Sequence, residues 1–273
     1  MKRAGPAAAV RLQYSRWRAV SVAALIVTMA AATEAGAVIK GTSSSLGRHT
    51  VRLIGPYYCS GVAIARKAVA TAAHCARRSM RVHAGGRSIG IAGISHSAVL
   101  DDGRRVSVSG DAAILLLASP LPAGIGAAPI GDGEGETFTI AGYGTMNERY
   151  QGAFGTLHEA RLVAAEARAL VDPNRTGSIG ANACFGDSGG PVLRGSMLVG
   201  IITRAAHPHP RIACGHLTRW ATVTASGTAG EGAVMASTGA GVQVEATPNV
   251  KRHKRKRLAP QQAQWFSTPI IEP

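Results

Sequence analysis

Three residues of this chain have the types and surroundings that nucleophilic catalysis needs. Ser188 lies in ACFGDSGGPV at 183–192, where glycines allow steep turns and leave room for a second molecule. A serine hydroxyl is a poor nucleophile at neutral pH, so it needs a base to take its proton and an acid to orient that base. His74, in TAAHC at 71–75, and Asp111, in GDAAILLL at 110–117, are a candidate base and acid.

Each of the three residues also has an ordinary structural explanation when it is taken alone. A Gly-Asp-Ser-Gly run is often a tight turn, one histidine among nine can be incidental, and an aspartate before a strand commonly stabilises a turn. The catalytic hypothesis therefore rests on the three together and on elements that bring them to one place.

The composition favours β-strands as these elements. Aromatic residues are only 4% of the chain and glycine contributes 34 residues, so we expect a core of small aliphatic side chains with many turns. Short apolar runs alternate with Gly, Ser and Pro turns, namely VRLI at 51–54, AVATAA at 68–73, ILLLA at 114–118, TFTIAGYG at 137–144 and LVGIIT at 198–203. This pattern predicts an all-β sandwich or barrel. Only 157–170 is helical by composition, although GTLHEARLV also reads as a strand.

Residues 1–37 have the features of a cleavable export signal. Five basic residues precede an apolar run at 19–32, and Ala35-Gly36-Ala37 fits the small-residue pattern at a signal-peptidase site. A membrane anchor is the alternative, but the run is short for a span of about twenty residues. We therefore expect a secreted or periplasmic protein that is cut near Ala37.

Four cysteines form an even set, Cys59, Cys75, Cys184 and Cys214. In an exported chain such a set favours two disulfides, and the sequence alone leaves three pairings open. His207, His209 and His216 cluster near Cys214, but no Cys-x-x-Cys pair occurs, so we expect no metal ion.

The formal charge of +15 is unevenly distributed, with +4 in 1–37, +6 in 38–250 and +5 in 251–273. The body is thus only mildly basic, and no nucleic-acid surface is expected on it. Residues 224–273 have low complexity and include the basic run 251–257, which we interpret as a disordered, solvated tail. The alternative is a tail that contacts anionic surfaces such as nucleic acid or lipid.

Taken jointly, the motifs of 38–223 resemble the chymotrypsin and trypsin family of serine proteases. The similar stretches are VIKG at 38–41, CSG at 59–61 with AAHC at 72–75, AGYG at 141–144 and the serine loop at 184–192, with His, Asp and Ser in the family's order. The resemblance implies two six-stranded antiparallel β-barrels with the active site in the cleft between them. It also implies a secreted serine endopeptidase that cleaves protein or peptide substrates through an acyl-enzyme without metal or cofactor.

The resemblance assigns a role to individual residues. Ser188 would be the nucleophile, His74 the general base and then acid, and Asp111 the orienting carboxylate. The backbone N–H groups of Gly186 and Ser188 would form the oxyanion hole.

The resemblance further implies a pairing and an activation step. Cys59 would bond to Cys75 and Cys184 to Cys214. After the cut at Ala37, the new terminus at Val38 would pair with Asp187, so that export and activation are one event.

Some residues depart from the family's pattern at the substrate pocket. Asn182 stands where trypsin-like members have the pocket-floor Asp, and Thr203-Arg204-Ala205 replaces the usual Ser-Trp-Gly wall near Gly215. We therefore expect poor cleavage after Lys and Arg. The short spacers between the three catalytic candidates suggest the compact bacterial type, and we expect a monomer. The main alternative function is a catalytically silent binding protein with the protease fold.

Overall fold

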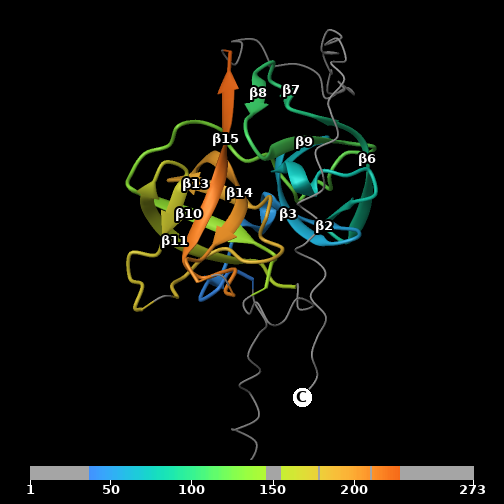
Figure 1. The fold of residues 1–273 in the computed structure, drawn as a ribbon. Coiled ribbons are helices and arrows are strands. Elements are labelled where there is room, and N and C mark those ends of the chain that lie inside the picture. The colour runs from blue at the N-terminus through green and yellow to red at the C-terminus, as the bar shows by residue number, and fades with distance from the viewer. Residues whose placement is uncertain (1–36, 146–154, 178, 210, 228–273) are drawn as a thin grey trace, which may run out of the picture.

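The computed structural model describes residues 37–145, 155–177, 179–209 and 211–227 of the chain. Within these ranges the chain forms fifteen strands and two short 3-10 helices, η1 (Leu46–Arg48) and η2 (Ala73–Cys75), and no α-helix. None of the described helices is long and apolar enough to span a membrane. Two barrels of strands lie side by side (Figure 1).

The first barrel is formed by the N-terminal half. Its closed antiparallel order is β2 (Thr50–Ile54), β3 (Tyr58–Ala65), β4 (Ala68–Ala72), β9 (Ala112–Leu117), β6 (Arg87–Ser95) and β5 (Arg81–Ala84). Side chains alternate between the two faces of a strand, so Val51 and Leu53 of β2 are buried inside the barrel, while Arg52 between them is exposed. Side chains of this inward kind from all six strands fill the barrel.

The second barrel is formed by the C-terminal half. It comprises β10 (Thr137–Gly142), β11 (His158–Glu166), β12 (Ala169–Val171), β13 (Pro191–Arg194), β14 (Met197–Ala206) and β15 (Leu217–Ser226). β12 pairs with both β11 and β15, which closes a ring of six strands. β1 (Thr42–Ser43) adds to β11, and Ile140, Leu162 and Ile202 are among the buried core residues.

The two barrels are joined by hydrogen bonds and by a shared core. β7 (Ser97–Val99) and β8 (Arg105–Val108) come from the N-terminal half, yet β8 pairs with the end of β15. A third apolar cluster contains Ile64 and Ile114 of the first barrel together with Leu198 and Ile201 of the second. Residues far apart in sequence are therefore held at the junction of the barrels.

The expected all-β class and the two six-stranded barrels are confirmed. The helical interpretation of 157–170 is wrong, because this segment forms β11 and β12. In β11, His158, Ala160 and Leu162 are buried in strict alternation, and pairing with β10 and β12 outweighs the helical composition. β15 continues past the expected domain end at Val223 to Ser226. The export signal before Ala37 and the tail after Gly227 lie outside the described residues.

Candidate active site

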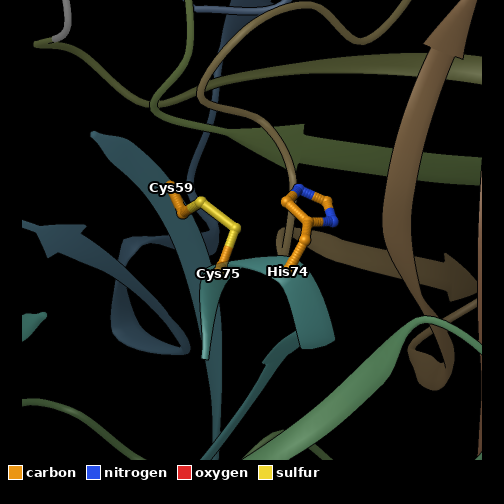
Figure 2. Close-up of side chains that lie close together, drawn as sticks. All are labelled: Cys59, His74 and Cys75. Atoms are coloured by element: carbon orange, nitrogen blue, oxygen red, sulfur yellow. A yellow bond between two sulfur atoms is a disulfide. The ribbon is translucent and has the colours of Figure 1, made fainter. Parts of the chain in front are cut away.

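His74 lies in η2, directly beside a disulfide. Cys59 of β3 is bonded to Cys75, with a Cα–Cα distance of 6.3 Å, and this bond fixes the segment that carries the imidazole (Figure 2). The three side chains bring potential metal-ligating atoms within 4.8 Å of one another. The two sulfurs are bonded to each other, however, so only the imidazole retains a lone pair suited to a metal ion.

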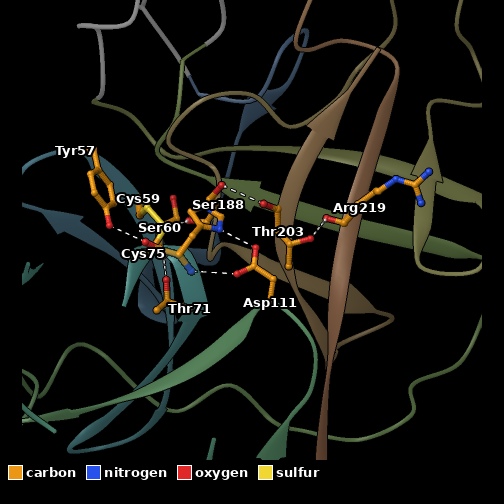
Figure 3. Close-up of polar contacts among 10 residues, drawn as sticks. Tyr57, Cys59, Ser60, Thr71, Cys75, Asp111, Ser188, Thr203 and Arg219 are labelled. Atoms are coloured by element: carbon orange, nitrogen blue, oxygen red, sulfur yellow. Dashed lines mark hydrogen bonds and ion pairs between the residues drawn. A yellow bond between two sulfur atoms is a disulfide. The ribbon is translucent and has the colours of Figure 1, made fainter. Parts of the chain in front are cut away.

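Asp111 holds His74 at two points. Its Oδ2 lies 2.8 Å from Nδ1 of the imidazole, and its Oδ1 accepts the backbone N–H of His74 at 3.0 Å (Figure 3). Strands β4 and β9 bring the two residues together, because Ala72 pairs with Ala112. The imidazole is thus oriented with Nδ1 on the carboxylate and Nε2 free to face another group. Both side chains are over two-fifths exposed, at 46% and 41%, so the pair lies at the surface rather than in the core.

Ser188 lies in the loop between β12 and β13, among residues of both barrels. Its carbonyl accepts the N–H of Ser60 at 2.8 Å, and its hydroxyl donates to the carbonyl of Thr203 at 3.5 Å (Figure 3). Among the described residues no hydrogen bond joins this hydroxyl to His74. Such a bond is commonly long in an enzyme without substrate and shortens when substrate binds.

The glycine after the serine is required by close packing. A Cβ on Gly189 would lie 2.0 Å from the carbonyl oxygen of Ser60 and 2.1 Å from Oγ1 of Thr71, and its φ is +89°. The serine loop can therefore approach β3 and β4 only with glycine at this position. Ser60 Oγ also donates to the carbonyl of Gly186 at 2.9 Å, which fixes the other side of the serine.

Two backbone N–H groups beside the serine are free to bind a ligand. Those of Gly186 and Ser188 donate to no acceptor in the described ranges, whereas the N–H of Gly189 donates to Ile202 at 2.7 Å. Gly186 has φ +90°, a left-handed value that suits glycine. The loop thus has two backbone donors without an acceptor, on the serine and two residues before it.

Asp187 is fully buried and accepts two backbone N–H groups, from Gly144 and Cys184, each at 2.8 Å. The backbone N–H of Val38 is a third group close enough to favour the charged carboxylate. Burial raises the pKa of Asp187 to about 7, although the three N–H groups act in the opposite direction. Gly144 is needed here, because a Cβ would lie 2.6 Å from Cγ of the aspartate.

Val38 reaches Asp187 in a conformation that is unfavourable for its type. Its φ is +60°, and the residue is fully buried. A β-branched residue rarely adopts a positive φ. The preceding Ala37 is also buried, and its N–H donates to Nδ1 of His158 at 3.1 Å. The bond expected to be cut is therefore inside the protein before cleavage.

Asn182 is completely buried beside Thr218. The Thr218 hydroxyl donates to Oδ1 of Asn182 at 2.8 Å, and the backbone of Asn182 pairs with Ile39 in both directions. Nδ2 of Asn182 has no hydrogen-bond partner in the described part of the chain. A buried donor without a partner is costly, so this amide is a candidate contact for a ligand.

The remaining pocket candidates lie on neighbouring segments. Thr203, Arg204 and Ala205 are at the end of β14, and Thr203 Oγ1 donates to the carbonyl of Arg219 at 3.2 Å. Gly215 has φ +91°, and its carbonyl accepts the N–H of Gly180 at 2.8 Å.

The second disulfide links the serine loop to the segment before β15. Cys184 is bonded to Cys214 with a Cα–Cα distance of 5.1 Å, so both bonds follow the pairing that the resemblance implied.

Three further residues that contribute to the site were missed by sequence reasoning. Ser60 bridges the barrels, because it accepts the N–H of Tyr143 at 2.9 Å while it donates to Gly186. Tyr143 is connected to the serine loop through Ser60, and Thr218 is hydrogen-bonded to Asn182. Ser60 and Tyr143 stand inside motifs that carried the resemblance, but no local signal indicates what either side chain contacts.

The structure has two β-barrels, and a histidine–aspartate pair and a serine in a glycine-rich loop lie where the barrels meet. This combination defines the class of two-barrel serine protease folds. The family model described as trypsin matches residues 38–224, so the chain belongs to the trypsin family. A trypsin of Xenopus laevis is 27% identical over 172 residues, which cover 55% of this chain and 71% of that protein. The structure is similar to neuropsin, a serine protease expressed in the limbic system of mouse brain, with a TM-score of 0.51 and 19% identity. That similarity covers 67% of this chain and 94% of that one, and it concerns the fold.

Proposed function

We propose that this protein is a serine endopeptidase that uses Ser188, His74 and Asp111. The observation that carries the proposal is the two-point contact of Asp111 with His74, at 2.8 and 3.0 Å. This contact orients the imidazole, keeps the proton on Nδ1 and leaves Nε2 to act as the base. Membership of the trypsin family supports peptide bonds as the substrate.

In the first half of the reaction, Ser188 Oγ attacks the carbonyl carbon of the scissile bond while Nε2 of His74 takes the hydroxyl proton. The negative charge on the carbonyl oxygen is bound by the N–H groups of Gly186 and Ser188, and Asp111 stabilises the imidazolium. His74 then gives its proton to the leaving amine as the C–N bond breaks. The products are a free amine and an ester on Ser188.

In the second half, a water molecule attacks the ester carbonyl and gives a proton to Nε2 of His74. The same two N–H groups bind the oxygen anion. When the C–O bond to Ser188 breaks, His74 returns the proton to the serine oxygen and the acid product leaves. No step needs a metal ion or an organic cofactor.

We further propose that cleavage after Ala37 completes the site. The Val38 nitrogen already lies beside Asp187, so cleavage would place an ammonium next to a buried carboxylate. Cleavage would also remove the Ala37 carbonyl carbon that defines φ of Val38, and with it backbone strain on the order of 1–3 kcal/mol. Export by a signal peptidase would then produce the active, secreted or periplasmic monomer.

The proposed pocket favours uncharged side chains before the scissile bond. Asn182 offers an amide donor but no charge, and a buried Lys or Arg without a compensating acid is strongly disfavoured.

Labelling with a fluorophosphonate tests the proposal. In this reaction Ser188 Oγ bonds to phosphorus and fluoride leaves. We expect one label per molecule, located on Ser188 by peptide mass spectrometry and absent from Ser188→Ala. A folded, Val38-started protein that does not react would contradict the proposal and favour the silent binding protein.

A further inference from the structure

The segment 38–100 is rich in basic residues and contains no acid. Residues 38–100 contain nine Lys and Arg and no Asp or Glu, whereas 101–227 contain ten bases and eleven acids. The nine are Lys40, Arg48, Arg52, Arg66, Lys67, Arg77, Arg78, Arg81 and Arg87. None of the nine forms a salt bridge within the described residues. This segment therefore has an uncompensated positive charge.

A cavity of about 180 Å³ lies among these basic residues, at the outside of the first barrel. Arg52, His83 and Arg87 line it, and no acidic residue does. Arg52 of β2 and His83 of β5 are paired across the strands, so their side chains lie on one face. Arg87 follows the Gly85-Gly86 turn at the start of β6.

A buried hydroxyl that lacks a partner lies next to the cavity. Thr50, another lining residue, is 1% exposed, and its Oγ1 has no hydrogen-bond partner among the described residues. A buried hydroxyl is normally hydrogen-bonded. The two guanidinium groups and the imidazole make the cavity rich in groups that can donate to an anion.

The electrostatic field at the cavity is positive. Burial lowers the pKa of His83, and the charges of Arg52 and Arg81 lower it further. An anion in the cavity would offset these two charges and favour the protonated imidazole.

The cavity is linked to the serine loop through one aromatic residue. The Arg52 guanidinium lies 5.4 Å from the ring centroid of Tyr143, which also lines the cavity. The Tyr143 N–H donates to Ser60 Oγ, which in turn donates to the carbonyl of Gly186. The positive cavity is thus close to the proposed oxyanion hole.

A second arginine–tyrosine pair lies beside the histidine. Arg77 lies 5.5 Å from the ring centroid of Tyr57, and the Tyr57 hydroxyl donates to the carbonyl of His74 at 2.6 Å. Figure 3 shows Tyr57 on one side of Ser188 and Thr203 on the other. Because the proposed pocket wall begins at Thr203, the side with Tyr57 would receive the part of the substrate that leaves first.

We propose that this cavity, and Arg77 on the Tyr57 side of Ser188, bind acidic side chains of the substrate on the C-terminal side of the scissile bond. The proposal rests on the proposed endopeptidase function. The donors converge on one cavity, which suits single carboxylates, whereas nucleic acid would need a row of cations that follows its phosphates. Substrates with Asp or Glu after the cleaved bond are therefore captured preferentially.

Paired peptides test the inference with the full chain. The residues before the scissile bond are randomised, and those after it contain either Glu or Gln at otherwise identical positions. We expect kcat/KM to be about five- to tenfold higher for the Glu peptides at low salt, with the difference reduced at high salt. The double variant Arg52→Gln/Arg87→Gln should lose this difference, whatever its rate on the Gln peptides.

Arg161→Gln is the matched control, because Arg161 is an exposed arginine on β11 of the other barrel. It should keep the preference for Glu. If the double variant keeps the preference, or if the parent protein has none, the inference is wrong.

A binding measurement separates this inference from the proposed function. Ser188→Ala in the full chain should bind a fluorescent Glu peptide more tightly than its Gln counterpart, as measured by anisotropy, and Arg52→Gln/Arg87→Gln should remove the difference. This result supports the site even if the parent protein cleaves nothing. If the double substitution weakens binding of a DNA oligonucleotide or heparin and leaves Glu-peptide binding unchanged, the site serves a polyanion and our inference is overturned.

Discussion

The backbone N–H of Val38 lies beside the carboxylate of Asp187, and both residues are fully buried. The contact exists while Ala37 is still attached, so the first residues of the expected mature chain already occupy their site. What cleavage would change is the charge: an amide N–H becomes an ammonium, which compensates a buried carboxylate far better.

The pH dependence of stability should therefore differ before and after cleavage. In the uncut chain the pKa of Asp187 is raised from 3.8 to about 7, so the folded state keeps a proton that the unfolded state loses. Stability is then fully present below about pH 4 and is lost as the pH rises towards 7. An ammonium at Val38 lowers this pKa and removes the loss. We expect the Tm difference between uncut and Val38-started protein to widen from pH 5 to pH 7.

Both forms should carry Ser188→Ala in this measurement, so that neither can cut itself. N-terminal sequencing of the exported parent protein should give Val38. Full activity in a protein with another first residue, or in Asp187→Asn, would contradict the proposed activation.

Substitution of the catalytic candidates should abolish activity and leave the fold intact. Ser188→Ala and His74→Ala remove reacting groups but little packing, and each should lower kcat by about 10³–10⁶-fold. The double variant should be no worse than either single one, because the two residues act in the same step. Additive losses, measured on the same peptide, would show that they act independently.

A charge at Asn182 should change the specificity. Asn182→Asp keeps an oxygen for the Thr218 hydroxyl and adds a buried negative charge. We expect cleavage after Lys and Arg to rise by about 10–100-fold relative to the parent protein, together with lower stability in the absence of substrate. A library of cleaved peptides measures both profiles. A parent profile dominated by Arg would show that another acid reaches the pocket.

Gly189→Ala should be much more destabilising than Gly103→Ala. The two glycines have similar φ values, +89° and +82°, so the backbone cost of alanine is about equal. The difference is space: a Cβ at Gly189 meets Ser60 and Thr71, while nothing lies within 4 Å at Gly103. We expect an extra loss of about 2 kcal/mol or more at Gly189 in urea unfolding. Equal losses would mean that the serine loop can move away from β3 and β4.

Much of the fold could be predicted from the sequence because short apolar runs and turns are local signals. The runs at 51–54 and 198–203 lie in strands, and the run at 114–118 does so up to Leu117. The segment 157–170 could not be predicted by composition, because its state depends on the strands that pair with it on both sides.

The candidate site likewise contains residues that could be predicted from the sequence and residues that could not. His74, Asp111 and Ser188 stand in distinctive local motifs, whereas Ser60 and Thr218 act only through contacts between distant segments. The concentration of charge in residues 38–100 can be counted in the sequence, but the overall charge of the body conceals it. The position of this charge beside the serine loop cannot be counted in the sequence, because it depends on the cross-strand pair of Arg52 and His83.

The two disulfides determine how the chain would come apart. Each connects cysteines of the same half, Cys59 with Cys75 and Cys184 with Cys214, and the chain has no other cysteine. The only covalent tie between the halves is therefore the polypeptide of residues 118–136, between β9 and β10. A single nick in that segment would yield two fragments that dissociate in denaturant without any reducing agent. Under native conditions the same fragments would stay associated through β8, β15 and the shared apolar cluster.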